Sequence, residues 1–361
     1  MKIVIFAGGY GTRMWPASRK SFPKQFYPVI RGKSFFQQTV ARFKKKYKSE
    51  DIYVSTEDAY VKLAREQAPD IPAKNYIVEP ERRDLLGAVG LVAAVIDKHS
   101  PGSVMFFSWS DHFINEEEEF LRAVQVAGDF CKETGRPVSL NERPTFPSTA
   151  HGWVQMGKKV DTRERKDLYQ IQKHVEKPDL KTAKKYFKDD TWLIHTGYGA
   201  WRSDLMLSYY EKYRPSEHEG LLKIQETWGT DSERKVLERE YGLFEKISVE
   251  YGLFEKLPND LRLTIPISVG WEDVGTWKLF FDAMKEGNEK NVIEGGAEAE
   301  FVESEGNLVY ARRGKLVGIV GMNSLVVIDT DDALLVVPMD KTEKVKQMFK
   351  KIETEKSRYV E

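Results

Sequence analysis

The sequence is poor in the residues that build disulfide frameworks and thiolate metal sites. Cys131 is the one cysteine among 361 residues, so an internal disulfide and a cysteine metal cage are both excluded. We expect its side chain to pack as a small hydrophobic group. The chain also lacks an apolar run of about 18 residues, and its opening run "IVIF" is too short for a signal sequence. These absences predict a cytoplasmic protein with no membrane partner.

An excess of charge of either sign is also missing. Lysine and arginine together number 56, and aspartate and glutamate together number 56, so the formal net charge is zero. No global field therefore favours nucleic acid or an anionic membrane, and any anionic partner must be bound locally. The hydrophobic content of 41% over this length can bury a sizeable core, which predicts one large domain and a smaller one.

Short apolar runs alternate with charged amphipathic stretches in the first part of the chain. Strand, helix and strand repeated in this way predict an α/β fold with a doubly wound sheet, whose binding crevice lies at the carboxyl ends of the strands. The expected strands are 2–6, 51–56, 75–80 and 103–112, and the expected helices are 36–47, 58–68 and 85–99.

The pattern changes near residue 286 to short alternating strands separated by turns such as "EGN", "RRG" and "GMN". A helical pattern over 341–353 closes this part of the chain. We therefore expect a catalytic domain over 1–287 and a smaller β-rich domain over 288–361.

The heptapeptide "EYGLFEK" occurs twice, at 240–246 and at 250–256. A period of ten residues is too short for a solenoid, so the pattern indicates a local duplication. At most one copy can line any given site.

A flexible and cationic loop, "FAGGYGTRMWPASRKSFPKQF" (6–26), follows the first expected strand. A dinucleotide-binding loop would need glycine where Met14 stands, and a P-loop would need Gly-Lys-Ser/Thr, which the loop lacks. Glycines behind a strand let backbone amides approach an anion, and Arg13 and Lys24 add positive charge, so a triphosphate fits. The alternative is a surface loop with solvated charges.

This loop resembles the signature of the sugar-1-phosphate nucleotidylyltransferases, and its "WPASR" and "PKQF" elements resemble the mannose-1-phosphate guanylyltransferase branch. The resemblance implies a Rossmann-like, doubly wound mixed sheet followed by a β-rich domain often used in subunit contact, and hence a homodimer. Further segments similar to the family follow in the family's order: "VEPERRDLLGA" (78–88), "SDH" (110–112), "VEKP" (175–178) and "GWEDVGTW" (270–277).

The resemblance also implies a reaction, in which a sugar 1-phosphate attacks the α-phosphorus of a nucleoside triphosphate and pyrophosphate leaves. Asp111 and Asp273 would hold Mg²⁺, Arg13 and Lys24 would steady the triphosphate, and Lys177 would bind the sugar phosphate. The nucleophile is already ionised, so no general base is needed. The alternatives are that each aspartate caps a turn and that "EKPD" is only a charged turn. His112 is expected to be structural or to face the sugar, because Mg²⁺ prefers oxygen ligands.

Guanine presents a ring N–H beside an exocyclic amine, and a carboxylate can accept from both. Glu79 and Asp84 lie in the segment that would do this, although Glu79 could merely end a strand and Asp84 could cap the helix after it. The expected nucleotide-binding residues are Ala7, Gly8, Gly9, Gly11, Thr12, Arg13, Lys24, Glu79, Asp84 and Asp111.

The chain departs from the family pattern in three segments of the base and sugar walls. It has "RDLLGA" (83–88) for R-N-T-A-P-A, "TAHGW" (149–153) for T-G-Y-G-Y and "IHTG" (194–197) for W-N-S-G. We expect the second copy of the repeat to line the sugar site, because the preceding segment "ISVEY" resembles the corresponding segment of the family. The first copy would then be a surface duplicate. The expected sugar-phosphate contacts are Gly152, Glu176, Lys177, His195 and Glu250.

GTP and mannose 1-phosphate, which would give GDP-mannose, are the substrates that the resemblance favours. The alternatives are another sugar phosphate or base in the same reaction, or a catalytically inactive nucleotide-sugar sensor. The sensor is disfavoured because binding alone would not require both Asp111 and Asp273.

Overall fold

A nine-stranded sheet organises the computed structural model, which describes residues 1–28, 30–285 and 287–361. The strand order is β3-β2-β1-β4-β9-β6-β10-β8-β7. The bounds in that order are Tyr76–Glu79, Ile52–Glu57, Lys2–Phe6, Val104–Trp109, Trp192–Arg202, Val138–Glu142, Leu263–Ile267, Lys166–Val175 and Trp153–Arg163.

The first four strands form the parallel half of this sheet. β1 pairs in parallel with β2 and β4, and β2 pairs in parallel with β3. β9 then runs antiparallel to β4 and to β6, which makes the sheet mixed. The predicted Rossmann-like mixed sheet is thus confirmed. The carboxyl ends of β1 to β4 meet at one edge, where this kind of fold binds its ligands.

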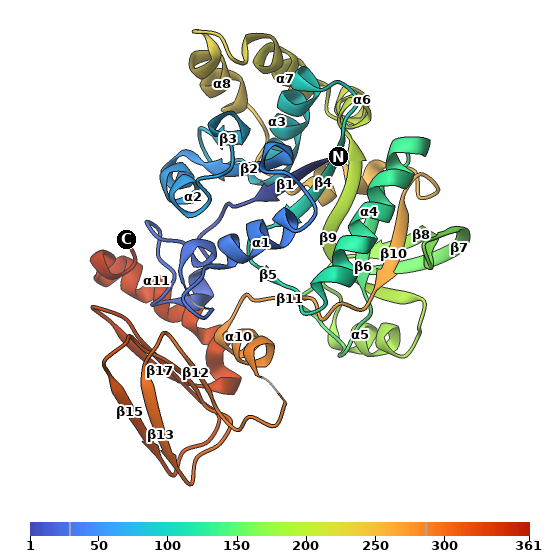
Figure 1. The fold of residues 1–361 in the computed structure, drawn as a ribbon. Helices are drawn as coiled ribbons and strands as arrows, with labels where there is room; N and C mark the ends of the chain where they lie inside the picture. Colours follow the sequence, from blue (N-terminus) through green and yellow to red (C-terminus); the bar gives the residue numbers. More distant parts are fainter. Residues whose placement is uncertain (29, 286) are drawn as a thin grey trace.

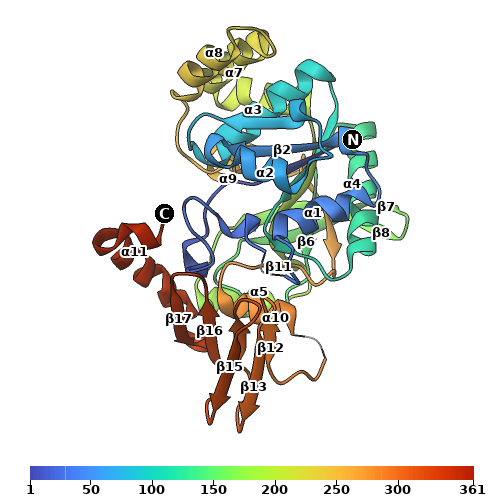
Figure 2. The same ribbon diagram turned by 60° about the vertical axis from the view of Figure 1, so that its left-hand side comes forward.

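Helices cover both faces of the sheet (Figures 1 and 2). α3 is buried along nearly its whole length and packs with α6 to α9 on one face, whereas α1, α2 and α4 pack on the other face. Cys131 in α4 is fully buried, as expected. The bounds are Phe35–Lys44 for α1, Val61–Gln67 for α2, Asp84–His99 for α3, Glu117–Thr134 for α4, Leu180–Phe187 for α5, Ser203–Tyr213 for α6, Pro215–Thr227 for α7, Glu233–Tyr241 for α8 and Val249–Gly252 for α9.

The last part of the chain is a small β-helix-like unit. β12, β14 and β16 stack in parallel and β17 closes this sheet, while β13 pairs in parallel with β15. The expected closing helix begins later than predicted, because its first turns form a 3-10 helix over Met339–Lys344. The bounds are Trp277–Met284 for α10, Val292–Glu294, Glu298–Val302, Leu308–Tyr310, Leu316–Val320, Leu325–Asp329 and Leu334–Pro338 for β12 to β17, and Val345–Glu355 for α11.

This unit packs directly against the glycine-rich loop. Trp15 of the loop shares a buried cluster with Trp277 of α10 and with Val326 of β16. The Trp15 indole N–H also donates to the carbonyl oxygen of Tyr359 at 2.9 Å. Two chain segments that are far apart in sequence therefore fix the outer side of the loop.

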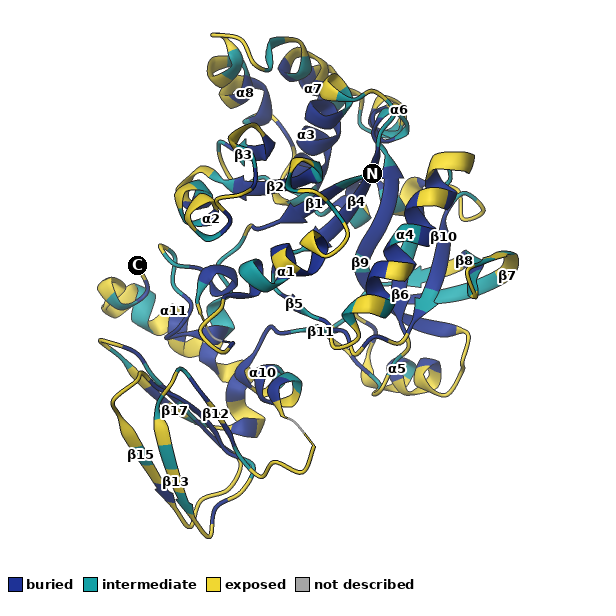
Figure 3. Ribbon diagram, in the orientation of Figure 1, coloured by how far each residue is buried: buried dark blue, intermediate teal, exposed yellow. Residues whose placement is uncertain are grey.

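Figure 3 shows that burial is concentrated in the central sheet, whereas β13 and β15 are largely exposed. No helix within the described ranges is both long enough and apolar enough to cross a membrane.

Candidate active site

The glycine-rich loop is held by side chains that follow it or face it. Gln25 donates from its side-chain amide to the carbonyl oxygens of Gly9 at 2.8 Å and Gly8 at 3.2 Å, and Thr56 donates to that of Ala7 at 2.8 Å. Gly11 has φ +52°, and a Cβ there would lie 2.7 Å from Cδ of Lys24. Glycine is therefore required at position 11 for the loop to fold back over Lys24.

Lys24 lies between the two aspartates that were predicted to hold a metal ion. Its Nζ is 2.8 Å from Asp111 Oδ2 and 3.8 Å from Asp273 Oδ1, and it also donates to the carbonyl oxygen of Val274 at 3.0 Å. Burial disfavours the ammonium, but attraction to both carboxylates outweighs it and raises the pKa of Lys24. Burial likewise opposes ionisation of Asp111, yet Lys24 holds its pKa below the usual range. The structure therefore brings together Lys24, Asp111 and Asp273.

Asp273 reaches this place through a short two-stranded sheet, β5 (His112–Phe113) with β11 (Glu272–Asp273), in which Asp273 pairs with His112. The Trp271 indole N–H donates to Nδ1 of His112 at 3.0 Å. Burial lowers the pKa of His112, so the ring is neutral and accepts this bond. His112 is thus structural and also lines the sugar-side pocket defined below.

Glu142 fixes the backbone just before β11. Its Oε1 accepts from the amide of Val269 at 2.9 Å and from that of Gly270 at 3.1 Å. Burial raises the pKa of this carboxyl to about 7, even though the backbone amides of Val269, Gly270 and Trp271 oppose the shift. Glu142 was not predicted, because a lone acidic residue at the end of a strand gives no signal of a partner more than a hundred residues away.

A pocket of about 230 Å³, the base-side pocket, opens at the carboxyl ends of β1 to β4. Among the predicted nucleotide-binding residues, Gly8, Gly9, Glu79, Asp84 and Asp111 line it. Asp84 has φ +61°, and its carboxylate accepts from the amide of Leu85 at 2.9 Å. Asp84 is the first residue of the helix, whose N-cap is Arg83 without a side-chain cap bond, so the capping alternative does not describe Asp84.

A second pocket of about 360 Å³, the sugar-side pocket, contains all five predicted sugar-phosphate residues, namely Gly152, Glu176, Lys177, His195 and Glu250. Asp273 also lines it, and Trp109 and Leu85 line both pockets. The two pockets therefore adjoin, with Asp111 in one wall and Asp273 in the other.

Glu176 and Lys177 form an ion pair of 2.9 Å at the mouth of the sugar-side pocket. The His174 ring, whose Nε2 lies 3.8 Å from Glu176 Oε2, and the Lys177 ammonium lower the pKa of Glu176 to about 2. The side chain of Lys177 remains 64% exposed, so its ammonium is available to an incoming anion.

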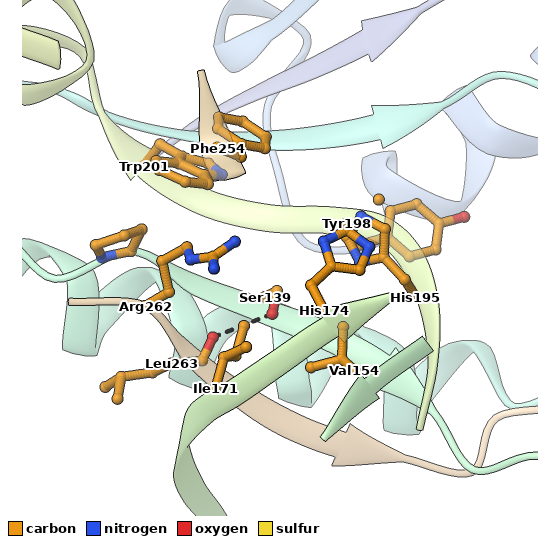
Figure 4. A pocket seen from close by; sticks show the side chains of 12 residues that line it. Ser139, Val154, Ile171, His174, His195, Tyr198, Trp201, Phe254, Arg262 and Leu263 are labelled. Carbon is orange, nitrogen blue, oxygen red and sulfur yellow. Dashed lines mark hydrogen bonds between the residues drawn. The ribbon is translucent and has the colours of Figure 1, made fainter. Parts of the chain in front are cut away.

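His195 stands between the sugar-side pocket and a smaller cavity of about 30 Å³ (Figure 4). Its ring lies 4.7 Å from that of His174, and its Nδ1 is 3.1 Å from Oδ1 of Asn141. Burial lowers the pKa of His195 to about 3, so this ring is neutral. The imidazole can therefore shape the pocket wall without adding charge to it.

Arg13 and Thr12, on the short 3-10 helix of the loop, lie outside both pockets. The Arg13 guanidinium points toward the β-rich unit and lies 3.4 Å from Glu343. A phosphate-binding role for Arg13 stays a prediction, as do the roles assigned to the other site residues.

Two further residues of the base-side pocket were missed by sequence analysis. Arg82 lies with its guanidinium 5.1 Å from the ring centre of Tyr10 and 3.7 Å from Glu57, and Glu57 accepts from the amide of Gly9 at 3.3 Å. The run "ERRD" was a usable signal for Arg82, whereas Glu57 at the end of β2 carried none.

One prediction about the repeat is wrong. The first copy, 240–246, is not a surface duplicate, because Tyr241 is fully buried and its hydroxyl donates to Oε2 of Glu79 at 2.6 Å. The aromatic ring of Tyr241 packs in the buried cluster that also contains Leu86 of α3 and Leu237 of α8.

Comparison with known proteins agrees with this arrangement. Residues 2–290 match the family model described as nucleotidyl transferase. The chain belongs to this family. Residues 299–352 match the model described as a MannoseP isomerase/GMP-like beta-helix domain. The predicted family and the predicted enzyme class, a nucleotidyltransferase, are thereby confirmed.

Several relatives of this nucleotidyltransferase carry related names. The Xanthan biosynthesis protein XanB of Xanthomonas campestris pv. campestris is 28% identical over 364 residues, covering 97% of this chain and 73% of that protein. A mannose-1-phosphate guanylyltransferase of Escherichia coli is 29% identical over 357 residues, covering 97% and 75%. A crystal structure from Thermus thermophilus, described as a mannose-1-phosphate geranyltransferase, superposes with a TM-score of 0.87 at 28% identity and covers 98% of this chain and 99% of that one.

Proposed function

We propose that the chain transfers the guanylyl group of GTP to mannose 1-phosphate and releases pyrophosphate, forming GDP-mannose. One observation carries this proposal: the base-side and sugar-side pockets adjoin, Asp111 lines the first and Asp273 the second, and both carboxylates approach Lys24. The relatives named as mannose-1-phosphate guanylyltransferases support the choice of base and sugar.

In this reaction a phosphate oxygen of the sugar 1-phosphate forms a bond to the α-phosphorus, and the bond from that phosphorus to the bridging oxygen of the β-phosphate breaks. The electron pair leaves with pyrophosphate. Because the attacking oxygen is already ionised, the protein needs to align two anions and offset their repulsion, and it needs no general base. Backbone amides of the glycine-rich loop, with Lys24 and Arg13, would bind the triphosphate, and Lys177 would bind the sugar phosphate.

Asp111 and Asp273 suit Mg²⁺ because both offer hard carboxylate oxygens and already share one cation, Lys24. No group of three or more histidine, cysteine, aspartate or glutamate side chains in the described part of the chain forms a metal site. The remaining ligands would therefore come from substrate phosphates and water. When bound, the ion would neutralise charge on the phosphate oxygens.

The proposal extends to the organisation of the chain. We propose a catalytic domain over 1–287 and a β-rich domain over 288–361, with a second copy of this chain on the exposed face of the β-rich domain. Apolar side chains of this face are more than half exposed, at 56% for Val302, 67% for Leu316 and 71% for Val320. Light scattering would test the homodimer.

A nucleoside triphosphate substrate supports a cytoplasmic reaction.

Pyrophosphate release across a panel of nucleoside triphosphates and sugar 1-phosphates tests the proposed function. We expect the highest kcat/KM with GTP and mannose 1-phosphate in the presence of Mg²⁺. Faster release with another pair would overturn the substrate assignment. No release with any pair, together with retained nucleotide-sugar binding, would favour a sensor.

A further inference from the structure

The wall of the base-side pocket is packed against the first copy of the repeat. We call residues 79–88 the base-wall segment. Tyr241 donates its hydroxyl to Glu79 at 2.6 Å, and the Arg83 guanidinium donates to the carbonyl oxygen of Phe244 at 3.3 Å. The amide of Leu86 then donates to the carbonyl oxygen of Ile247, just beyond that copy, at 3.2 Å. Three polar contacts thus tie this segment to residues 241–247.

The contact between Tyr241 and Glu79 is shielded from water. Tyr241 is 0% exposed and Glu79 is 7% exposed. Leaving either buried polar group without its hydrogen-bond partner would therefore destabilise the folded protein. Ser55 donates to the other carboxylate oxygen of Glu79 at a longer 3.3 Å. The shorter contact, from the tyrosine hydroxyl, therefore holds the carboxylate of Glu79 most closely, and Glu79 also lines the base-side pocket.

A glycine in the base-wall segment makes this approach possible. A Cβ on Gly87 would lie 2.8 Å from the Tyr241 hydroxyl and 3.1 Å from Cβ of Arg83. Any side chain at position 87 would therefore push the tyrosine away from Glu79. The close packing of α3 against α8 at this point depends on glycine.

The two copies of the repeat stand in different relations to the two pockets, because the first copy contacts a pocket residue from behind and the second copy lines a pocket itself. Tyr241 of the first copy supports Glu79 from below, whereas Glu250 and Tyr251 of the second copy line the sugar-side pocket. Tyr251, which aligns with Tyr241 in the repeat, is 52% exposed. The duplicated sequence thus contributes once to each half of the site.

We propose that Tyr241 is a positioning residue for nucleobase selection, because its hydroxyl orients Glu79 to accept hydrogen bonds from two adjacent N–H donors on one base edge. This inference rests on the proposed function. Guanine presents two such donors, hypoxanthine presents one, and adenine offers no such pair to a carboxylate. The nucleotide preference therefore follows from the orientation of one carboxylate.

The charged groups around Glu79 give this role a dependence on pH. Burial raises the pKa of Glu79 to about 7, and the nearby carboxylate of Glu57 adds to the shift, while Tyr241 and Arg82 oppose it. Removing the tyrosine hydroxyl would raise that pKa further. The protonated acid is a poorer hydrogen-bond acceptor than the carboxylate. In such a variant Glu79 would stay protonated to higher pH, and guanine binding should be weakened over that wider pH range.

The test compares Tyr241→Phe with Tyr76→Phe. Tyr76 lies on the same strand as Glu79 and is also buried, but its hydroxyl donates to the carbonyl oxygen of Ala68 at 2.9 Å, away from the pocket. Binding of GTP, ITP and ATP is measured by calorimetry from pH 6 to pH 9, alongside kcat and KM. We expect Tyr241→Phe to weaken GTP binding about tenfold at neutral pH, to leave ATP binding and kcat within about twofold, and to shift the pH profile for GTP upward. Tyr76→Phe should leave all three nucleotides unchanged.

A double variant with Glu79→Gln decides whether Tyr241 acts through Glu79. We expect Tyr241→Phe to have little further effect on GTP binding when Glu79 is already glutamine. Additive effects, equal losses for GTP and ATP, or a wild-type protein that binds ATP as tightly as GTP would each overturn the inference. Guanine-selective binding that depends on Tyr241, without pyrophosphate release, would support the inference and refute the proposed function.

Discussion

Asp273 pairs with His112 across the two-stranded sheet of β5 and β11, and this pairing sets Asp273 beside Asp111. The two carboxylates are separated by more than 160 positions in the chain, yet one lysine ammonium reaches both. A hydrogen-bonded register therefore fixes the spacing of the two acidic groups, so that it does not depend on a flexible loop.

Replacing Asp273 by alanine should nearly abolish turnover and leave the fold intact. Asp273 is partly exposed and lies at the end of β11, so its loss removes charge from the site without opening the core. We expect kcat to fall by at least about 100-fold, the size seen when one electrostatic group of an active site is removed. Circular dichroism checks the fold, and Asp282→Asn, an exposed carboxylate paired with Lys278 on α10, is the control. A near-normal rate would remove Asp273 from the site.

Replacing Lys24 by methionine should make stability depend on Mg²⁺. Without the ammonium, Asp111 and Asp273 face each other uncompensated, and loss of one partner of a buried ion pair costs about 3 kcal/mol. We expect a lower Tm in EDTA and a larger rise on adding Mg²⁺ than in the wild type. Lys20→Met, which removes surface pairs with Glu353 and Glu361, should change Tm little in either condition. If Mg²⁺ raised the Tm of the wild type and of the variant equally, this would contradict the idea that Asp111 and Asp273 share Lys24 as their cation.

The sequence predicted the parts of the site that depend on local pattern. The glycine-rich loop after β1 is visible as a single cationic segment, and so Lys24 could be named, whereas Asp111 and Asp273 were named from the resemblance of their segments to the family. Their meeting was implied by family resemblance, and spacing alone could not give it. Strand pairing between β5 and β11 is a tertiary contact.

Residues that act from a distance could not be predicted. Glu142, Gln25 and Tyr241 are polar side chains whose partners are set by packing, so their contacts could not be predicted even where, as for Gln25 and Tyr241, the residue lies in a recognised motif. The start of α11 at Val345 shows a similar limit, since amphipathic spacing does not separate a 3-10 turn from an α-helix. Tyr241 was misplaced because an exact repeat suggests that one copy is redundant, whereas the two copies meet different surroundings.

Replacing Lys177 by alanine should chiefly weaken use of the sugar phosphate. The ammonium is exposed at the mouth of the sugar-side pocket, and a charge-assisted contact of this kind is worth enough to raise KM for mannose 1-phosphate by about tenfold or more. The KM for GTP should stay within about twofold, because Lys177 does not line the base-side pocket. Lys173→Ala, which changes an exposed lysine on β8, the strand that ends two residues before Lys177, is the control. An unchanged KM for the sugar phosphate would argue against this role.

Glu142 should make the free energy of unfolding depend on pH. Its pKa is raised by burial to about 7 in the folded chain, from a usual value of 4.5, so the folded state holds this proton more tightly than the unfolded state does. The resulting stability is fully present below about pH 4.5 and is lost as pH rises through about 7. Glutamine at this position cannot ionise, and its side-chain oxygen can still accept from the amides of Val269 and Gly270.

The free energy of unfolding of Glu142→Gln, relative to the wild type, should therefore increase as pH rises from 5 to 8. Urea denaturation at each pH measures this difference. Glu66→Gln changes an exposed residue of α2 in a loose pair with Lys62, and should keep the wild-type slope. A difference between Glu142→Gln and wild type that stays constant across this range would mean that Glu142 titrates alike in the folded and unfolded chain, and that its hold on the backbone before Asp273 does not depend on its protonation.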